Sequence, residues 1–337
     1  MSLRPAPTDR SPRDRLSFGV VNLDKPPGPS AHEVTAWVRD AAGVERAAHA
    51  GTLDPKVTGC LPILLGDATR LAQVFLDGHK EYVAVLELHR PPPADFESVL
   101  ASFEAELYQK PPRKSAVRRR LRTRTVSDLS VVDRDGRQVL LRIVCESGTY
   151  VRKLCHDLGL ALGTGAHMGN LRRTGTTPFD DRDLVTLHDF VDALAFDEAG
   201  DPEPLAAAVD PAERAASHLW RVTIPENAAR EVAEGAPVYA PGVLSVDPPR
   251  TEKTVGATDD RVGEAGEVPD EQATEADGDS DAPRDGDGSE DTSAELPETG
   301  TTVLCVTPDG AAVCLGTLVG DPDAESGEVV SLERVLV

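Results

Sequence analysis

The segment from residue 247 to residue 300 most restricts how this chain can fold. It consists largely of Gly, Asp, Glu, Ser, Thr and Pro, and it has no aromatic residue. Such a segment cannot bury enough apolar surface to offset the conformational entropy lost on folding. We therefore expect a disordered acidic insert. The β-rich residues after the insert must then complete a domain that begins before it.

The insert also dominates the charge of the chain, which is −23 overall. Residues 251–300 hold 17 acidic and three basic residues, so the rest of the chain is only mildly acidic. By contrast KPPRKSAVRRRLRTR, residues 110–124, has eight basic residues and no acidic one. The overall acidity therefore does not exclude RNA as a partner, because a local basic segment can contact phosphates.

Outside the insert the composition is that of a soluble globular protein. No apolar run reaches the roughly 20 residues needed to span a membrane. Residues 1–16 are rich in Pro and Arg and lack an apolar segment, which excludes a secretory signal. They predict a flexible arm, or one ordered only by docking. Five cysteines without a CxxC pair indicate reduced thiols and a cytoplasmic protein, not disulfides or a zinc site.

Residues 17–215 alternate between strand and helix patterns, which predicts an α+β domain with a mixed or antiparallel sheet flanked by helices. The clearest helix begins at a capping box, Ser30 and Glu33, and ends at Gly43. Its expected inward face is formed by Val34, Trp37, Val38 and Ala41. Further helices are expected at 67–77, 95–107 and 147–163, strands at 18–25 and 80–89, and a hairpin over 126–146 that turns at Asp135 and Gly136.

Residues 216–337 have a different pattern, with short apolar runs separated by Gly and Pro. This pattern predicts a small β-barrel-like domain, interrupted by the acidic insert at about 247–300.

The loop HAGTLDPKVTG, residues 49–59, places a single carboxylate, Asp54, before the apolar run CLPILLG. Taken alone, Asp-Pro predicts only a turn. Loops of this kind nevertheless carry functional residues more often than core residues. The other segments of the chain decide between these interpretations.

Four segments together resemble the motifs of the tRNA pseudouridine synthase B family. They are LDKPPGPSAHEV at 23–34, HAGTLDPKVTGCLPILLGDATRL at 49–71, KEYVA at 80–84, and SGTYVRKLCHDLG with GAHMGNLRRT over 147–174. The basic segment and CESGTYVRKLCHDLGLALG resemble the dyskerin branch, the catalytic subunit of box H/ACA guide particles. The region containing GAPVYAPGVL resembles a PUA RNA-binding domain.

The resemblance implies a role for each matching residue. Asp54 matches the nucleophile, Tyr82 the tyrosine that stacks on the target base, Arg152 the arginine that pairs with the nucleophile, and Leu171 a pocket residue. Lys25 and His49 match residues that flank the site and are expected to contact RNA. The basic residues expected to contact phosphates are Arg113, Lys114, Arg118, Arg119, Arg120, Arg172 and Arg173.

The implied activity is isomerisation of uridine to pseudouridine in tRNA or rRNA, with a guide RNA and small accessory proteins as partners. The reaction breaks an N–C glycosidic bond and makes a C–C bond, so no cofactor or metal is expected. Aspartate, with an unperturbed pKa of about 3.9, is already an anion at neutral pH. The sequence leaves open whether the anion attacks the ribose or the pyrimidine. It also leaves open guided action on rRNA, stand-alone action on the TΨC-loop uridine of tRNA, and a non-catalytic RNA-binding scaffold.

The acidity is unusual for an RNA enzyme, and we interpret it as adaptation of an archaeal protein to high salt. At 1 M salt, repulsion between carboxylates is screened within about 3 Å. Dialysis tests this interpretation, because a protein that stays folded and active at low salt would exclude it.

Overall fold

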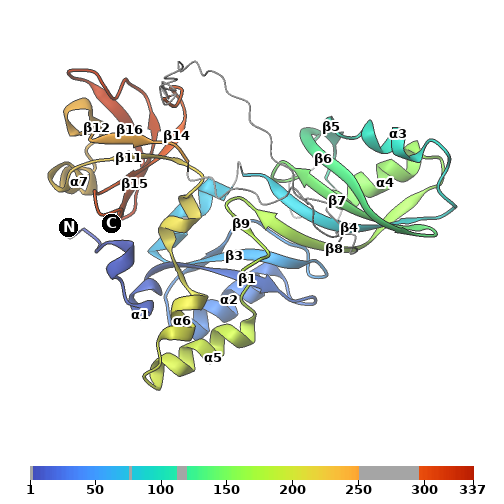
Figure 1. The fold of residues 1–337 in the computed structure, drawn as a ribbon, viewed down its shortest axis with the longest axis horizontal. Helices are drawn as coiled ribbons and strands as arrows, with labels where there is room; N and C mark the ends of the chain where they lie inside the picture. The colour runs from blue at the N-terminus through green and yellow to red at the C-terminus, as the bar shows by residue number, and fades with distance from the viewer. Residues whose placement is uncertain (1–2, 76–77, 112–119, 250–295) are drawn as a thin grey trace, which may run out of the picture.

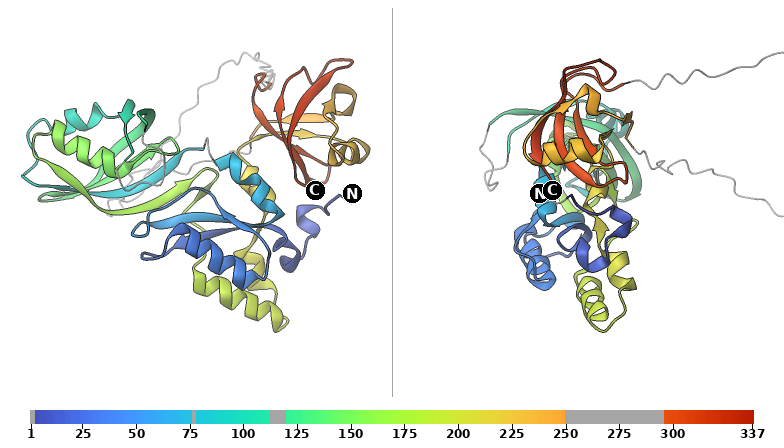
Figure 2. Two further views of the ribbon diagram at one scale, coloured as in Figure 1. Left: turned by 180° about the vertical axis from the view of Figure 1, so that it is seen from behind. Right: turned by 90° about the vertical axis from the view of Figure 1, so that its left-hand side faces the viewer.

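The computed structural model describes residues 3–75, 78–111, 120–249 and 296–337. Most of the predicted insert therefore lies outside the described residues. The molecule is elongated: α3 and α4 lie at one end of a long sheet, α2, α5 and α6 lie beside its other half, and a small β domain lies next to that half, beside both chain termini (Figures 1 and 2). Among the described residues, no helix combines the length and apolar character that crossing a membrane requires.

The order of the elements confirms an α+β chain. The strands are β1 Phe18–Lys25, β2 Ala47–His49, β3 Thr58–Gly66, β4 Lys80–Leu88, β5 Glu106–Gln109, β6 Arg122–Asp135, β7 Gln138–Cys145, β8 Ala166–Thr176, β9 Phe179–Asp180, β10 Asp210–Pro211, β11 Trp220–Thr223, β12 Val238–Tyr239, β13 Ser245–Asp247, β14 Thr302–Val306, β15 Ala312–Leu318 and β16 Glu328–Val335. The helices are α1 Pro12–Arg15, α2 Ala31–Ala42, α3 Phe96–Ala101, α4 Val151–Ala161, α5 Leu187–Glu198, α6 Glu203–Ala208 and α7 Glu226–Ala233, with 3₁₀ turns η1 Pro7–Asp9, η2 Asp67–Phe75, η3 Ala212–Ala216 and η4 Ala240–Gly242.

The large sheet has the strand order β10-β1-β3-β8-β4-β7-β6-β5, with β2 beside β3 and β9 beside β8. Its strand pairs are antiparallel except where β3 meets β8. There Thr58 and Gly59 lie opposite Arg172 and Arg173. This parallel contact joins the two halves of the sheet, so it brings the end of the Asp54 loop beside a segment that comes much later in the chain.

Local sequence signals explain most of the helix ends. Ser30 and Glu33 form the predicted capping box of α2, and Gly43 ends the helix at φ 65°. Val34 and Val38 are buried as predicted, but Trp37 and Ala41 are exposed, so the prediction that these two face inward is wrong. Helix α3 ends at Ala101, not near residue 107, because the following residues form β5 and pair with β6. The predicted helix at 67–77 is the 3₁₀ turn η2.

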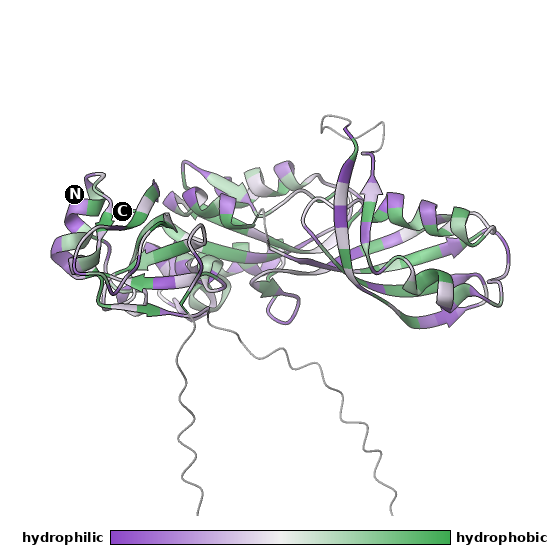
Figure 3. Ribbon diagram, turned by 90° about the horizontal axis from the view of Figure 1, so that it is seen from above, coloured by the Kyte–Doolittle hydropathy of each residue, from purple (hydrophilic) through white to green (hydrophobic). Residues whose placement is uncertain are grey.

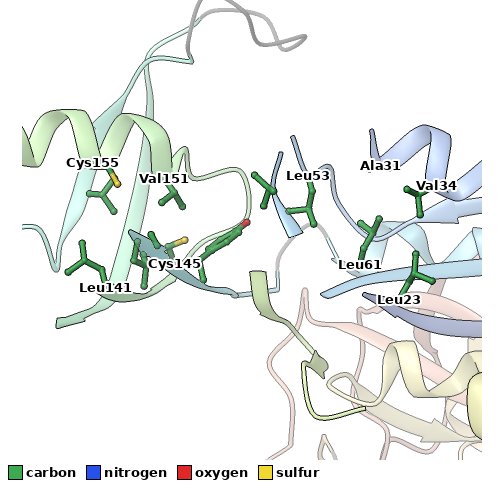
Figure 4. Packing of buried hydrophobic residues seen from close by; sticks show 14 of the residues in the cluster. Leu23, Ala31, Val34, Leu53, Leu61, Leu141, Cys145, Val151 and Cys155 are labelled. Atoms are coloured by element: carbon green, nitrogen blue, oxygen red, sulfur yellow. The ribbon is translucent and has the colours of Figure 1, made fainter. Parts of the chain in front are cut away.

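One hydrophobic cluster runs through both halves of the large domain. It includes Leu23 and Leu61 beneath α2, Leu141 beneath α4, and Val151 in the first turn of α4. Figure 4 shows Leu53, from the Asp54 loop, between the side chains of Leu61 and Val151. Hydrophobic and hydrophilic residues alternate along many elements, as expected when one face is buried (Figure 3). All five cysteines are free and buried, as predicted.

The small domain forms a six-stranded sheet with the order β12-β16-β15-β14-β11-β13. It does not have a core entirely of its own. Leu304 and Leu315 from this sheet belong to the same buried cluster as Phe18 and Leu64 from the large sheet. The shared apolar contact fixes the small domain against the large one.

Residues 3–16 are docked between the two domains, so the prediction of a flexible arm is wrong and the docking alternative holds. Arg10, which is almost fully buried, donates two hydrogen bonds of 2.9 and 2.7 Å to the Glu213 carboxylate. Glu213 also accepts the backbone N–H of Ala312 in the small domain. Arg4 donates to the Leu336 carbonyl and to Asp67. Paired arginines thus order a segment that has few apolar residues.

We expect Arg10→Met to lower the free energy of unfolding by about 3 kcal/mol or more, because it leaves the mostly buried Glu213 carboxylate without its cation. Denaturant unfolding at high salt measures the change. Arg13→Met is the matched control, since Arg13 pairs with Asp197 at a site where half of its side chain is exposed. Equal stability of both variants would contradict a docking role for Arg10.

Candidate active site

The Asp54 loop connects β2 to β3 and is held by buried residues on both sides of the aspartate. Leu53 and Val57 are both 4% exposed, whereas the Asp54 side chain is 52% exposed. The Asp54 carbonyl accepts the Val57 N–H at 2.9 Å, which closes the turn that Asp-Pro predicted. The loop therefore presents one carboxylate outward from a fixed backbone.

Lys25 holds the Asp54 loop in place through hydrogen bonds to its backbone. Its side chain is fully buried, and its Nζ donates three hydrogen bonds of 2.9–3.0 Å to the carbonyls of Pro26, Pro55 and Val57. Burial lowers the pKa of this ammonium group. The prediction that Lys25 contacts RNA is wrong, because its three donors are already used and its charge is out of reach.

Arg152 lies in the first turn of α4 and forms an ion pair with Asp54. Both side chains are about half exposed. The two residues are far apart in the sequence, and the pair forms because Leu53 and Val151 pack in the same cluster. The structure thus brings together the two residues that the resemblance assigned to one another.

Tyr82 and Leu171 lie on the neighbouring strands β4 and β8. Tyr82 is 9% exposed and faces Arg173 across the strand pair, whereas Leu171 lies opposite Ala84 and packs on the edge of the core. Burial raises the pKa of the Tyr82 hydroxyl, and the nearby positive charge of Arg173 opposes the rise. The tyrosine is therefore neutral and held in place at neutral pH.

The two arginines of LRRT differ from the prediction that both contact phosphates. Arg173 is 1% exposed, and its Nε donates to the Cys60 carbonyl at 2.6 Å. A phosphate contact is therefore wrong for Arg173. Arg172 forms a two-bond pair with Asp24, while 38% of its side chain stays exposed.

Most of the basic segment lies outside the described residues, including Arg113, Lys114, Arg118 and Arg119. Arg120 is described and is exposed just before β6.

His49 has surroundings that only the structure reveals. Its ring meets the ring of His32 edge-on at 4.8 Å, and its Nδ1 is buried without a hydrogen-bond partner. Burial, with smaller contributions from His32 and Arg173, lowers the pKa of His49. The sequence did not predict His32 at the site. It lies in the first turn of α2, and the docking of that helix beside β2 brings the two rings together.

A second histidine, His218, has its pKa lowered by burial as well. Below about pH 6.5 the unfolded chain takes up protons that the folded protein does not, so its stability decreases as the pH falls. We expect a loss of at most about 1.4 kcal/mol per histidine per pH unit. Unfolding measurements between pH 7 and pH 5 should show a weaker dependence for His49→Asn, whereas the control His188→Asn, on α5, should keep the wild-type dependence. Equal pH dependence of both variants would contradict the assignment.

One hollow in the described part of the chain is not lined by Asp54. Its volume is about 1300 Å³, and it lies between the large sheet and the small domain. Glu81 and Arg142 line it, on the face of the sheet opposite to Tyr82. The candidate site is the open surface around Asp54, which is suited to a polymer and not to an enclosed small molecule.

Comparisons with known proteins identify the family of this chain. Three family descriptions match: DKCLD (NUC011) domain at residues 5–35, TruB family pseudouridylate synthase N-terminal domain at 39–94, and tRNA pseudouridylate synthase B C-terminal domain at 152–217. Proteins named probable tRNA pseudouridine synthase B are 58% identical in Halobacterium salinarum and 56% identical in Haloarcula marismortui. Both alignments span the whole chain, with 100% and 94% of the relatives covered.

This chain belongs to the TruB family of pseudouridine synthases, and it is an isomerase. Its structure is similar to that of the Cbf5 protein in a crystal structure of a Cbf5–Nop10–Gar1 complex. The TM-score is 0.80 at 38% identity, with 100% of this chain and 90% of that chain covered. A structure of an H/ACA RNP bound to a substrate RNA containing 2′-deoxyuridine matches with a TM-score of 0.79 at 36% identity, covering 99% and 90%. The relatives confirm the predicted archaeal branch.

Proposed function

We propose that this pseudouridine synthase isomerises uridines in an RNA that a box H/ACA guide RNA presents, with Asp54 as the nucleophile. The observation that carries the proposal is the ion pair between Asp54 and Arg152 on an open surface. An anion held beside a guanidinium keeps its charge when RNA covers it and removes water. The intact pair argues against a non-catalytic scaffold, which would not need it.

The chemistry assigns Asp54 a transient covalent role. Its carboxylate attacks the ribose or the uracil ring, the bond between N1 and C1′ breaks, and the base turns. A bond then forms between C5 and C1′, and the bond to Asp54 breaks and returns the free carboxylate. The hydrogen on C5 leaves as a proton, and N1 gains a proton. The nucleoside is thus rearranged without a net gain or loss of atoms, and it exchanges only protons with the solvent. The Arg152 guanidinium orients the carboxylate throughout.

The uridine must leave its stack to reach Asp54. Turning a nucleotide out costs a few kcal/mol, and stacking on an aromatic ring recovers about 1–3 kcal/mol. Tyr82 supplies that ring, and Leu171 on the neighbouring strand covers the edge of the base. The buried Tyr82 is already fixed before RNA binds, so little side-chain entropy is lost.

Two observations support the guided mode. The Cbf5 protein that this chain resembles over its full length was crystallised with Nop10 and Gar1, and the related H/ACA RNP holds a substrate RNA. We therefore propose small accessory proteins and a guide RNA as partners. Stand-alone action on the TΨC-loop uridine of tRNA is the second candidate, because the relatives with 58% and 56% identity carry the name tRNA pseudouridine synthase B.

The remaining assignments follow from these partners. We propose that the small domain, residues 216–337, is a PUA domain that binds RNA, and that Arg120 and Arg172 contact phosphates. Because tRNA and rRNA are its proposed substrates, we also propose that this enzyme acts in the cytoplasm.

Release of tritium from C5 of uridine distinguishes the modes. Wild-type protein at high salt is incubated with labelled rRNA fragment plus guide RNA and accessory proteins, or with labelled tRNA alone. Release only with the guide supports the first mode, and release from tRNA alone supports the second. No release in either arm, from protein that binds both RNAs, would favour the scaffold.

A further inference from the structure

Arg173 is the largest fully buried side chain in the described part of the molecule, and it carries a positive charge. Arginine is almost never fully buried unless it is paired. Arg173 donates from Nε to a backbone carbonyl, but no ion pair with a carboxylate is found for it among the described residues, and its Nη2 is buried without a hydrogen-bond partner. An unpaired buried charge is costly, so its presence calls for a physical role.

The location of Arg173 suggests that role. Its backbone lies opposite Gly59 of β3 on one side and opposite Tyr82 of β4 on the other. Arg173 thus lies on β8, between β3, which follows the Asp54 loop, and β4, which carries Tyr82. A Cβ atom at Gly59 would lie 2.2 Å from the Arg173 carbonyl oxygen. Strands β3 and β8 therefore approach each other so closely at this point that they leave no room for a side chain on residue 59.

The side chain continues this connection beneath the loop. Nε donates to the carbonyl of Cys60, directly after the loop, and Nη1 lies 3.5 Å from the position that a Cβ at Gly51 would occupy, shortly before Asp54. The same guanidinium exerts its charge on the Tyr82 hydroxyl and on the His49 ring. One rigid, planar group therefore bonds to the chain directly after the Asp54 loop, lies near Gly51 at its start, and acts on the Tyr82 hydroxyl.

We propose that Arg173 is a positioning residue that fixes the Asp54 loop relative to Tyr82, so that the carboxylate and the stacked base meet in the reactive geometry. The proposal rests on the function proposed above. Arg173 does not touch RNA, because it is buried, and it acts through the loop and through Tyr82. A displacement of about 1 Å between reacting groups can cost about 100-fold in rate.

Single-turnover tritium release with saturating enzyme tests the proposal, together with a separate measurement of RNA binding. We expect Arg173→Met to lower the rate about 100-fold while RNA affinity changes less than about threefold. Arg173→Lys keeps the positive charge but loses the planar guanidinium with its several N–H donors, so it should recover only part of the rate. Arg134→Met, at an arginine far along the sheet that pairs with Glu97, is the control and should retain the wild-type rate.

A double-mutant cycle separates positioning from general loss of structure. Because Arg173 acts partly through Tyr82, Arg173→Met should cost less in a Tyr82→Phe background than in the wild type. An unchanged rate, a loss confined to RNA affinity, or fully additive effects would each overturn the proposal. If Arg173→Met fails to fold, the Arg173→Lys cycle decides by the same criteria. Absence of release by wild-type protein would instead contradict the proposed function.

Discussion

Asp54→Asn is expected to abolish pseudouridine formation, with a decrease of about 10⁴-fold or more in single-turnover rate. The amide has nearly the same shape as the carboxylate, but it lacks the charge and the nucleophilic oxygen. Asp54 is half exposed and makes its side-chain ion pair only with Arg152 among the described residues, so the fold should remain intact. Tritium release from C5 measures the rate.

Asp157→Asn is the matched control for this prediction. Asp157 is also an aspartate in an ion pair, but its partner is Lys153, and both of these residues lie on α4. It should retain wild-type activity. RNA affinity of the Asp54→Asn protein should stay within about threefold of wild type, since one carboxylate contributes no attraction to phosphates. Appreciable release by Asp54→Asn would remove this residue as the nucleophile.

Arg152→Met should lower the rate by about 10²–10³-fold, the usual effect of removing one charged donor from an active site. The guanidinium orients the carboxylate and balances its charge when RNA excludes water. Arg152→Lys retains a cation without the planar fork and should lie between Met and the wild type. Both rates come from the same single-turnover assay.

Lys153→Met, at the next residue of the same helix, controls for changes in α4. Lys153 pairs with Asp157 and does not approach Asp54 in the described contacts. If Arg152→Met weakens RNA binding but leaves the rate of bound RNA unchanged, Arg152 is a phosphate contact and the ion pair has no catalytic role.

Short stretches of the chain were enough to predict most helices and strands and to identify Asp54 and Arg152 as a pair. Ser30, Glu33 and Gly43 define α2 through hydrogen bonds to residues nearby in the chain, so a short window contains the information. Asp54 and Arg152 were identified because their motifs resemble those of a family. The small β domain was also expected, since strands interrupted by Gly and Pro appear on both sides of the acidic insert.

The roles of the buried cations follow from contacts between segments that are distant in the chain. Lys25, Arg173 and Arg10 look in sequence like solvated or RNA-binding charges. Lys25 is buried against the Asp54 loop, Arg173 lies at the parallel contact of β3 with β8, and Arg10 is buried by the docking of the arm between the two domains. Whether a charge meets water, a carbonyl or a carboxylate is set by segments far away in the chain, and no short window of sequence contains that information.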